Sequence, residues 1–169
     1  RKNVYELILS FKNILSSLNK NYSLVICGSL KDEGLRLKEI TKELLIDDKV
    51  IFTDFVVDYD LPYFHNASDL FVYPSSYEGF GLPILEAMSC QTPVITSNTS
   101  SIPEVANNSA ILIDPFDKSA LSEAMLRVLN SPSLLAEYGE KGYKNSLKFT
   151  WSNTAKLTLS AYIDILREN

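Results

Sequence analysis

Residues that could do chemistry gather in one short stretch, in which Glu78 is followed by two glycines and, eight positions on, by Glu86. Gly79 and Gly81 let the backbone approach a ligand closely or take positive φ. Pro83 suits a first helical turn, so a helix is predicted to begin here, with its free N–H groups facing the glycines. Such a helix start favours an anion such as a phosphate.

The two carboxylates flank this predicted phosphate site. Glu86 lies about 8 Å along the helix, at a rise of about 1.5 Å per residue, where a carboxylate can accept two hydrogen bonds from a ribose diol. Glu78, on the near side, can meet the group beyond the phosphate. The residues leave a structural interpretation open as well, because glycine turns commonly join strands to helices and the helix dipole alone favours Glu near a helix start.

Short apolar segments alternate with amphipathic ones around this stretch, which indicates βαβ units and a parallel sheet. Apolar residues on both sides of each strand predict helices over both faces. The expected fold class is therefore α/β, a Rossmann-like doubly wound parallel sheet that binds its ligand at the carboxyl ends of the strands. Strands are predicted at 22–27, 50–53, 70–73, 93–96 and 110–113, and helices at 3–19, 35–45, 61–66, 82–89, 117–130, 132–147 and 151–167.

The length of 169 residues predicts a single domain over 1–169. Such domains usually open on a strand, whereas this chain opens on an amphipathic helix with Asn3 as its expected cap. We therefore expect the first strand of the sheet to be missing. His65, the single histidine, is expected to be a surface or half-buried helix residue and is no candidate base.

Composition excludes several classes of protein. The chain has 16 Lys and Arg against 21 Asp and Glu, a net charge of −5, which argues against nucleic-acid binding. Hydrophobic residues make up 46% and charged residues 22%, as in soluble globular proteins rather than disordered ones. No apolar run approaches the ~18 residues of a membrane span, and no signal-peptide pattern is found at the start. Cys27 and Cys90 are expected to be buried thiols in a reducing cytoplasm.

Residues 78–88 resemble the Glu-x7-Glu signature of the retaining GT-B glycosyltransferases of family 4, the glycosyl transferases group 1. The resemblance covers nearly the whole chain and implies the C-terminal, nucleotide-sugar-binding half of a GT-B fold. It also implies that the N-terminal acceptor domain is missing along with the first strand. The further segments that carry the resemblance are 66–75, 92–96, 102–105, Asp114-Pro115 and Phe149-Thr150-Trp151.

The resemblance also implies a role for individual residues. Glu78 would lie by the donor sugar and the reacting centre, and Glu86 would bind the ribose hydroxyls. Lys2 matches the lysine that meets the diphosphate, whereas Arg1 does not match the family's upstream arginine. Backbone amides of the glycine loop would hold sugar hydroxyls and the diphosphate. The implied donor-binding residues are Lys2, Gly79, Phe80, Gly81, Leu82 and Glu86, with Phe55 and Val56 near the nucleobase.

This chain departs from the family's pattern in three turns. Gln91 stands where glycine is usual, Asp54 where glycine is frequent, and Asn107-Asn108 where Gly-Asp or a similar pair is common. All are expected to be variations within turns, although Asp54 could affect base selection.

The function that follows from the resemblance is transfer of a sugar from a nucleotide-sugar, UDP- or GDP-linked, to a glycan, lipid or other acceptor in polysaccharide biosynthesis. The chain alone is expected to be inactive without its acceptor half. No metal or other cofactor is expected, because the sequence has no cluster with metal-ligand spacing and because a helix dipole and basic side chains would neutralise the diphosphate. The expected location is cytoplasmic, with any contact to the membrane face made through the missing domain. The alternative is a non-transferring nucleotide-sugar-binding module or a GT-B-type epimerase.

Overall fold

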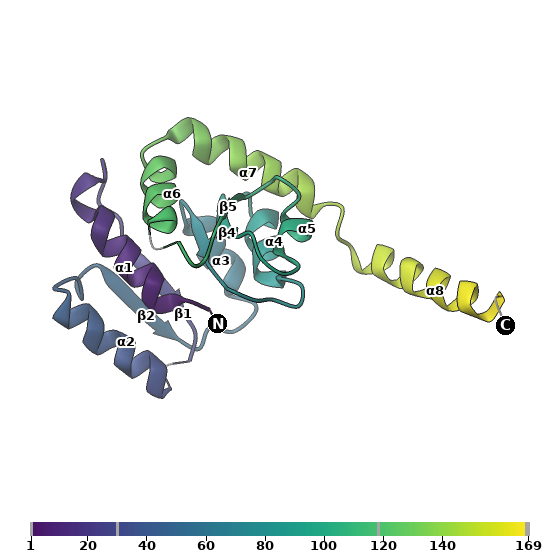
Figure 1. Cartoon of the computed structure of the whole chain (residues 1–169), viewed down its shortest axis with the longest axis horizontal. Helices are drawn as coiled ribbons and strands as arrows, with labels where there is room; N and C mark the ends of the chain where they lie inside the picture. The colour runs from purple at the N-terminus through teal and green to yellow at the C-terminus, as the bar shows by residue number, and fades with distance from the viewer. Residues whose placement is uncertain (1, 30, 118, 168–169) are drawn as a thin grey trace.

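The computed structural model describes residues 2–29, 31–117 and 119–167, in which five strands alternate with helices (Figure 1). This order confirms the predicted α/β class. The strands are β1 (Leu24–Cys27), β2 (Val50–Asp54), β3 (Phe71–Tyr73), β4 (Val94–Ser97) and β5 (Ile111–Ile113). The α-helices are α1 (Val4–Ile14), α2 (Asp32–Glu43), α3 (Leu61–Ala67), α4 (Leu82–Ser89), α5 (Ile102–Ala106), α6 (Ala120–Leu129), α7 (Pro132–Ser146) and α8 (Trp151–Arg167).

All strand pairs are parallel, as predicted, but they form two sheets rather than one. β1 pairs with β2, and β3, β4 and β5 form a second sheet in that order. No described strand lies between β1 and β3, so the two sheets meet through side chains instead of a hydrogen-bonded ladder. Apolar residues of both sheets, including Ile26 and Ile95, belong to one hydrophobic cluster.

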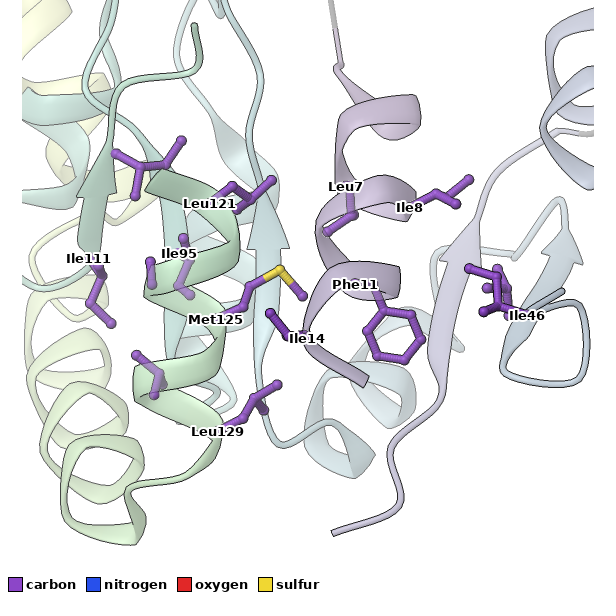
Figure 2. Close-up of a cluster of buried hydrophobic side chains, with 14 of the residues drawn as sticks. Leu7, Ile8, Phe11, Ile14, Ile46, Ile95, Ile111, Leu121, Met125 and Leu129 are labelled. Atoms are coloured by element: carbon purple, nitrogen blue, oxygen red, sulfur yellow. The ribbon is translucent and has the colours of Figure 1, made fainter. Parts of the chain in front are cut away.

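Helix α1 fills the space between α6 and the β1–β2 sheet (Figure 2). Its apolar side chains recur every three or four residues, so that Leu7, Ile8, Phe11 and Ile14 are all buried. Each contributes about 1.5–3 kcal/mol by leaving water. Helix α1 ends at Ile14 and is followed by a 3₁₀ turn, Leu15–Ser17. The α-helix is therefore shorter than the predicted range of 3–19.

One expectation about a polar helix residue is confirmed in part, and another is wrong. Asn3 occupies the N-cap position of α1, as expected, but its side chain makes no capping hydrogen bond, and its Nδ2 donates to the carbonyl oxygen of Pro74 at 3.0 Å. This bond ties the start of α1 to the loop after β3. His65 is buried rather than on the surface, with its ring edge-on to Phe71 at a centroid distance of 5.0 Å. Burial lowers the pKa of His65, so it is neutral in the folded protein at pH 7.

One face of the β1–β2 sheet stays open to solvent. Val25 and Ile51 are exposed there, and so is Cys27, two residues after Val25 on the same face of the strand. Cys90 is half-buried. The expectation of two buried thiols is therefore wrong, because the described helices do not cover both faces of these edge strands.

The positions at which this sequence departs from the glycines of the family that it resembles have left-handed backbones. Gln91 follows the end of α4 with φ 59°, and Asp54 ends β2 with φ 61°. Asn107 and Asn108 have φ 44° and 62° after α5. Glycine adopts this region without steric cost, and Asn and Asp tolerate it better than other residues do. The prediction that these positions lie in turns is confirmed for Gln91, Asn107 and Asn108, whereas Asp54 is still the last residue of β2.

Helices α4 and α7 pack so closely that α7 uses glycine at the contact. A Cβ on Gly139 would lie 2.6 Å from the backbone oxygen of Gln91. A Cβ on Gly142 would lie 3.0 Å from Cγ of Met88, a flexible side chain that can move. Helix α7 therefore packs directly against α4 and fixes the direction of the α4 axis.

We expect Gly139→Ala to lower the free energy of unfolding by about 1–2 kcal/mol, because overpacking against a backbone atom outweighs the gain in helix propensity. Gly142→Ala is the matched control, with a smaller loss. Urea unfolding followed by circular dichroism measures both. An alanine at 139 that is as stable as the parent would show that α7 can shift without cost.

Helix α8 extends away from the rest of the molecule (Figure 1). None of its side chains is buried, and Trp151 is 81% exposed. Within the described ranges, no helix is long and apolar enough to cross a membrane.

Candidate functional site

The candidate site lies at the carboxyl ends of β3 and β4, which meet at one edge because the strands are parallel. β3 ends at Tyr73, and the loop 74–81 leads from it to α4. The start of α1 reaches the same edge through the bond from Asn3 to Pro74. Three segments that are far apart in the sequence are thereby brought together.

Hydroxyl groups at the end of β4 and directly after it hold the loop after β3. The backbone N–H of Glu78 donates to Oγ of Ser100 at 3.0 Å, and Oγ of Ser101 donates to the carbonyl oxygen of Glu78 at 3.0 Å. Oγ of Ser97 donates to the carbonyl oxygen of Ser75. The backbone of Glu78 is therefore fixed on both sides before any ligand arrives.

The carboxylate of Glu78 accepts three side-chain hydrogen bonds, all through Oε1. The donors are Nζ of Lys2 at 2.8 Å, the hydroxyl of Tyr73 at 2.8 Å and Oγ of Ser75 at 2.7 Å. Nζ of Lys2 also donates to the Tyr73 hydroxyl. The Glu78 side chain is 12% exposed, and that of Lys2 is 46% exposed. The structure thus joins two predicted site residues, Lys2 and Glu78, in one ion pair.

The surroundings of Glu78 keep it charged. Burial by itself would raise the pKa of this carboxyl, but the hydrogen bonds from Lys2, Ser75 and Tyr73, together with the Lys2 charge, lower its pKa to about 2. The same contacts raise the pKa of Lys2 against the opposing effect of burial. A carboxylate and an ammonium group therefore face this edge throughout the neutral range.

The glycine loop opens α4 as predicted. Gly81 occupies the N-cap position with φ 102°, a conformation that L side chains rarely adopt, and Pro83 is in the first turn. Among the described residues, no acceptor pairs with the backbone N–H of Phe80, Gly81 or Leu82. These N–H groups, at the positive end of the α4 dipole, are available to an anion.

Glu86 lies on the exposed side of α4 and lines a hollow of about 270 Å³ between α3 and α4. Asp58, His65 and Cys90 also line this hollow. Burial raises the pKa of Glu86, and the charge of Asp58 raises it further. A hydroxyl-bearing ligand in this hollow would meet a carboxylate with few competing donors.

The two predicted nucleobase residues, Phe55 and Val56, lie apart from the other predicted site residues. Phe55 is 72% exposed directly after β2, and Val56 is half-buried. In the described part of the chain neither lines the hollow beside Glu86; Asp58, two residues further along the same loop, does. Their nucleobase role stays a prediction.

Sequence reasoning missed the residues that hold Glu78. Tyr73 reads as an apolar strand residue, and Ser100 and Ser101 read as ordinary loop serines more than twenty positions away. The only local signal is a hydroxyl-rich stretch at two consecutive strand ends, which parallel pairing brings to one edge. Asp58 was missed in the same way.

Fold and site together define a Rossmann-like α/β domain with an anion-directed site at the carboxyl ends of its strands. Residues 1–145 match the family described as glycosyl transferases group 1. The chain belongs to this family.

Individual relatives agree with this assignment. O-antigen chain mannosyltransferase B of Escherichia coli is 36% identical over 162 residues, which make up 96% of this chain and 42% of the relative. Sucrose-phosphate synthase of Thermosynechococcus elongatus has a TM-score of 0.86 at 26% identity, over 100% of this chain and 43% of that one. Anabaena Alr3699/HepE, solved in complex with UDP and glucose, shares the fold with a TM-score of 0.82 at 19% identity, over 96% of this chain and 45% of its own. The chain spans less than half the length of each of these proteins.

Across the described residues, no three or more His, Cys, Asp and Glu side chains are grouped to hold a metal ion. The positive groups at the site are Lys2 and the start of α4.

Proposed function

We propose that this chain is the donor-binding part of a retaining glycosyltransferase and that its ligand is a nucleoside-diphosphate sugar. The observation that carries the proposal is the Lys2–Glu78 ion pair beside the unpaired N–H groups at the start of α4. The pair offers one positive and one negative group next to an anion-directed backbone. Glu86 follows within the same helix, toward the hollow.

Each group has a separate part in this proposal. The N–H groups of Phe80, Gly81 and Leu82 bind the diphosphate, and Lys2 adds a positive charge. Glu86 accepts hydrogen bonds from the ribose hydroxyls, and Glu78 lies beside the sugar ring. These roles match the charges and exposure that the residues have at the carboxyl edge of the sheet.

In the transfer step, the bond between the anomeric carbon and the diphosphate oxygen breaks, and its electron pair leaves with the diphosphate. An acceptor oxygen forms the new bond to that carbon and gives its proton to the departing diphosphate or to water. Lys2 and the α4 dipole stabilise the negative charge that grows on the leaving diphosphate, and such preorganised stabilisation is commonly the largest catalytic contribution. Retention of configuration is part of the proposal, without a commitment to a front-face or covalent route.

The substrate class is proposed from chemistry and from the relatives. A sugar beside Glu78, a diphosphate at the start of α4 and a ribose beside Glu86 at the hollow follow the order of these groups along the chain, and UDP or GDP would supply the nucleoside. The Escherichia coli relative is named as an O-antigen chain mannosyltransferase, which supports a hexose donor and a role in polysaccharide assembly. Anabaena Alr3699/HepE, which has the same fold, was solved in complex with UDP and glucose, and this supports a nucleotide and a sugar as ligands.

The rest of the enzyme is also part of the proposal. β1 and β3 both have an edge that no described strand pairs with, and a preceding strand between them would join the two sheets. The relatives are more than twice as long as this chain, which leaves room for an acceptor domain. We place the full enzyme in the cytoplasm, with any membrane contact through that domain.

We expect this chain to bind a UDP- or GDP-sugar in the presence of EDTA and to transfer no sugar. Calorimetric titration measures binding, and a thermal shift of the same sample confirms that the folded state binds. A product assay with an acceptor follows. Binding that is lost in EDTA and restored by Mg²⁺ or Mn²⁺ would contradict the metal-free site, and sugar transfer by this chain alone would contradict the half-enzyme interpretation.

A full-length enzyme separates the alternatives. Transfer to an acceptor supports the glycosyltransferase. Binding and sugar isomerisation without transfer would instead support an epimerase, and binding without any reaction would support a binding module.

A further inference from the structure

Among the residues that the structure describes, Tyr73 is the one neutral residue that hydrogen-bonds to both charged groups of the site. Its hydroxyl donates to Oε1 of Glu78 at 2.8 Å and accepts from Nζ of Lys2, which also lies 4.5 Å from the centroid of the Tyr73 ring. The phenol is part-buried at the last position of β3. It therefore links the ion pair to the end of β3.

The ring and backbone of Tyr73 are held in place. Its ring stacks on that of Phe71 at a centroid distance of 5.8 Å and an interplanar angle of 16°. Its carbonyl oxygen accepts from Oγ1 of Thr96 on the neighbouring strand at 2.8 Å. A hydroxyl mounted on a fixed ring and a paired strand has little freedom to move when a ligand binds.

The three side-chain donors to Glu78 in the described part of the chain all use the same oxygen. Oε1 receives Lys2, Tyr73 and Ser75, while no side-chain donor in the described ranges pairs with Oε2. The carboxylate is therefore oriented, with Oε2 left for an external donor. Sugar hydroxyls are such donors.

Lys2 is not a permanent partner of Glu78 if it also meets a diphosphate. Its side chain is 46% exposed and carries four rotatable bonds, so it can turn toward the start of α4. Tyr73 and Ser75 would then remain on Oε1. Burial raises the pKa of the Tyr73 phenol, so it stays protonated and keeps donating at neutral pH.

We propose that Tyr73 is a positioning residue that holds Oε1 of Glu78, so that Oε2 faces the donor sugar while Lys2 turns to the diphosphate. This inference rests on the proposed function. It predicts that Tyr73 matters for the sugar part of the donor and not for the nucleotide part.

The test compares the affinity for a nucleoside diphosphate with the affinity for the matching nucleotide-sugar, in the full chain and in Tyr73→Phe. The ratio of the two dissociation constants isolates the sugar contribution. Tyr73→Phe is expected to bind UDP or GDP like the parent and to lose about tenfold of the sugar preference, the lower end of the range for a hydrogen bond to a charged group. Tyr77→Phe is the matched control: Tyr77 precedes Glu78, is 62% exposed, and is expected to leave the ratio unchanged.

The dependence on pH gives a second readout. Loss of the phenol hydrogen bond raises the pKa of Glu78 from about 2. As the pH is lowered, Glu78 of Tyr73→Phe is therefore protonated at a higher pH than Glu78 of the parent, and the sugar preference should decline at that higher pH. A loss of packing alone would not move this midpoint. Ser75→Ala removes the other neutral donor and should lower the sugar preference in the same way.

The outcomes separate the inference from the proposed function. No binding of either nucleotide by the parent chain would overturn the proposed function and this inference with it. Sugar-selective binding by the parent that is unchanged in Tyr73→Phe and Ser75→Ala would overturn the inference alone. An equal loss for nucleotide and nucleotide-sugar would assign Tyr73 a purely structural role and also overturn it.

Discussion

Gly81→Val is expected to abolish measurable binding of nucleotide-sugars while the chain stays folded. Gly81 has φ 102° at the N-cap of α4, and an added Cβ would lie 3.2 Å from Cδ1 of Ile84. A β-branched residue cannot adopt this backbone without strain of about 1–3 kcal/mol, so the loop will change its conformation. That change redirects the N–H groups of Gly81 and Leu82, which the proposal assigns to the diphosphate.

The measurement is calorimetric titration of parent, Gly81→Ala and Gly81→Val, with circular dichroism to verify folding. Gly81→Ala is also strained at this positive φ, but its Cβ is not branched. It should therefore lose only part of the affinity. The valine variant should lose more than about 100-fold. Parental affinity in a folded Gly81→Val would mean that the glycine loop is only a turn, which is the structural interpretation that the sequence leaves open.

Glu86→Ala is expected to weaken nucleotide-sugar binding by about 1.5–3 kcal/mol, or roughly 10- to 150-fold, the range for hydrogen bonds to a charged group. The carboxylate lines the hollow with Asp58, and burial and that charge raise its pKa. Affinity should therefore fall as the pH drops through this raised pKa, because a protonated carboxyl accepts fewer hydrogen bonds.

Glu123→Ala on α6 is the matched control, since it removes the same charge from an exposed helix position outside the site. Glu86→Gln tests the charge separately from the size of the side chain. All three variants are titrated with nucleoside and nucleotide under the same conditions. An unchanged affinity in folded Glu86→Ala would refute the ribose assignment, and an equal loss in Glu123→Ala would reduce it to a general effect of net charge.

Local sequence was sufficient to predict the frame of the site. Two glycines and Pro83 between an apolar strand and an amphipathic segment are compatible with few local structures other than a turn followed by a helix. The structure places this helix, α4, at 82–89 as predicted. The positive φ angles of Gln91, in a turn, and of Asp54, at the end of β2, could be predicted from the family's glycines, because glycine is favoured where φ is positive.

The contacts that orient Glu78 could not be predicted in this way. Tyr73, Ser100 and Lys2 are separated by tens of residues, and only the parallel register of β3 and β4 and the bond from Asn3 bring them to one edge. The open face at Cys27 could not be predicted either, because an apolar strand pattern does not say which neighbours cover it.

The exposed helix α8 has a consequence for local opening. A lone helix of 17 residues is only marginally stable in water, and this one gains nothing from buried side chains. Its backbone hydrogen bonds should therefore break and re-form independently of the α/β domain. In the terms of amide hydrogen exchange, 151–167 is expected to exchange orders of magnitude faster than α1 or α4, so that its protection reports on the helix alone while the domain keeps its global stability.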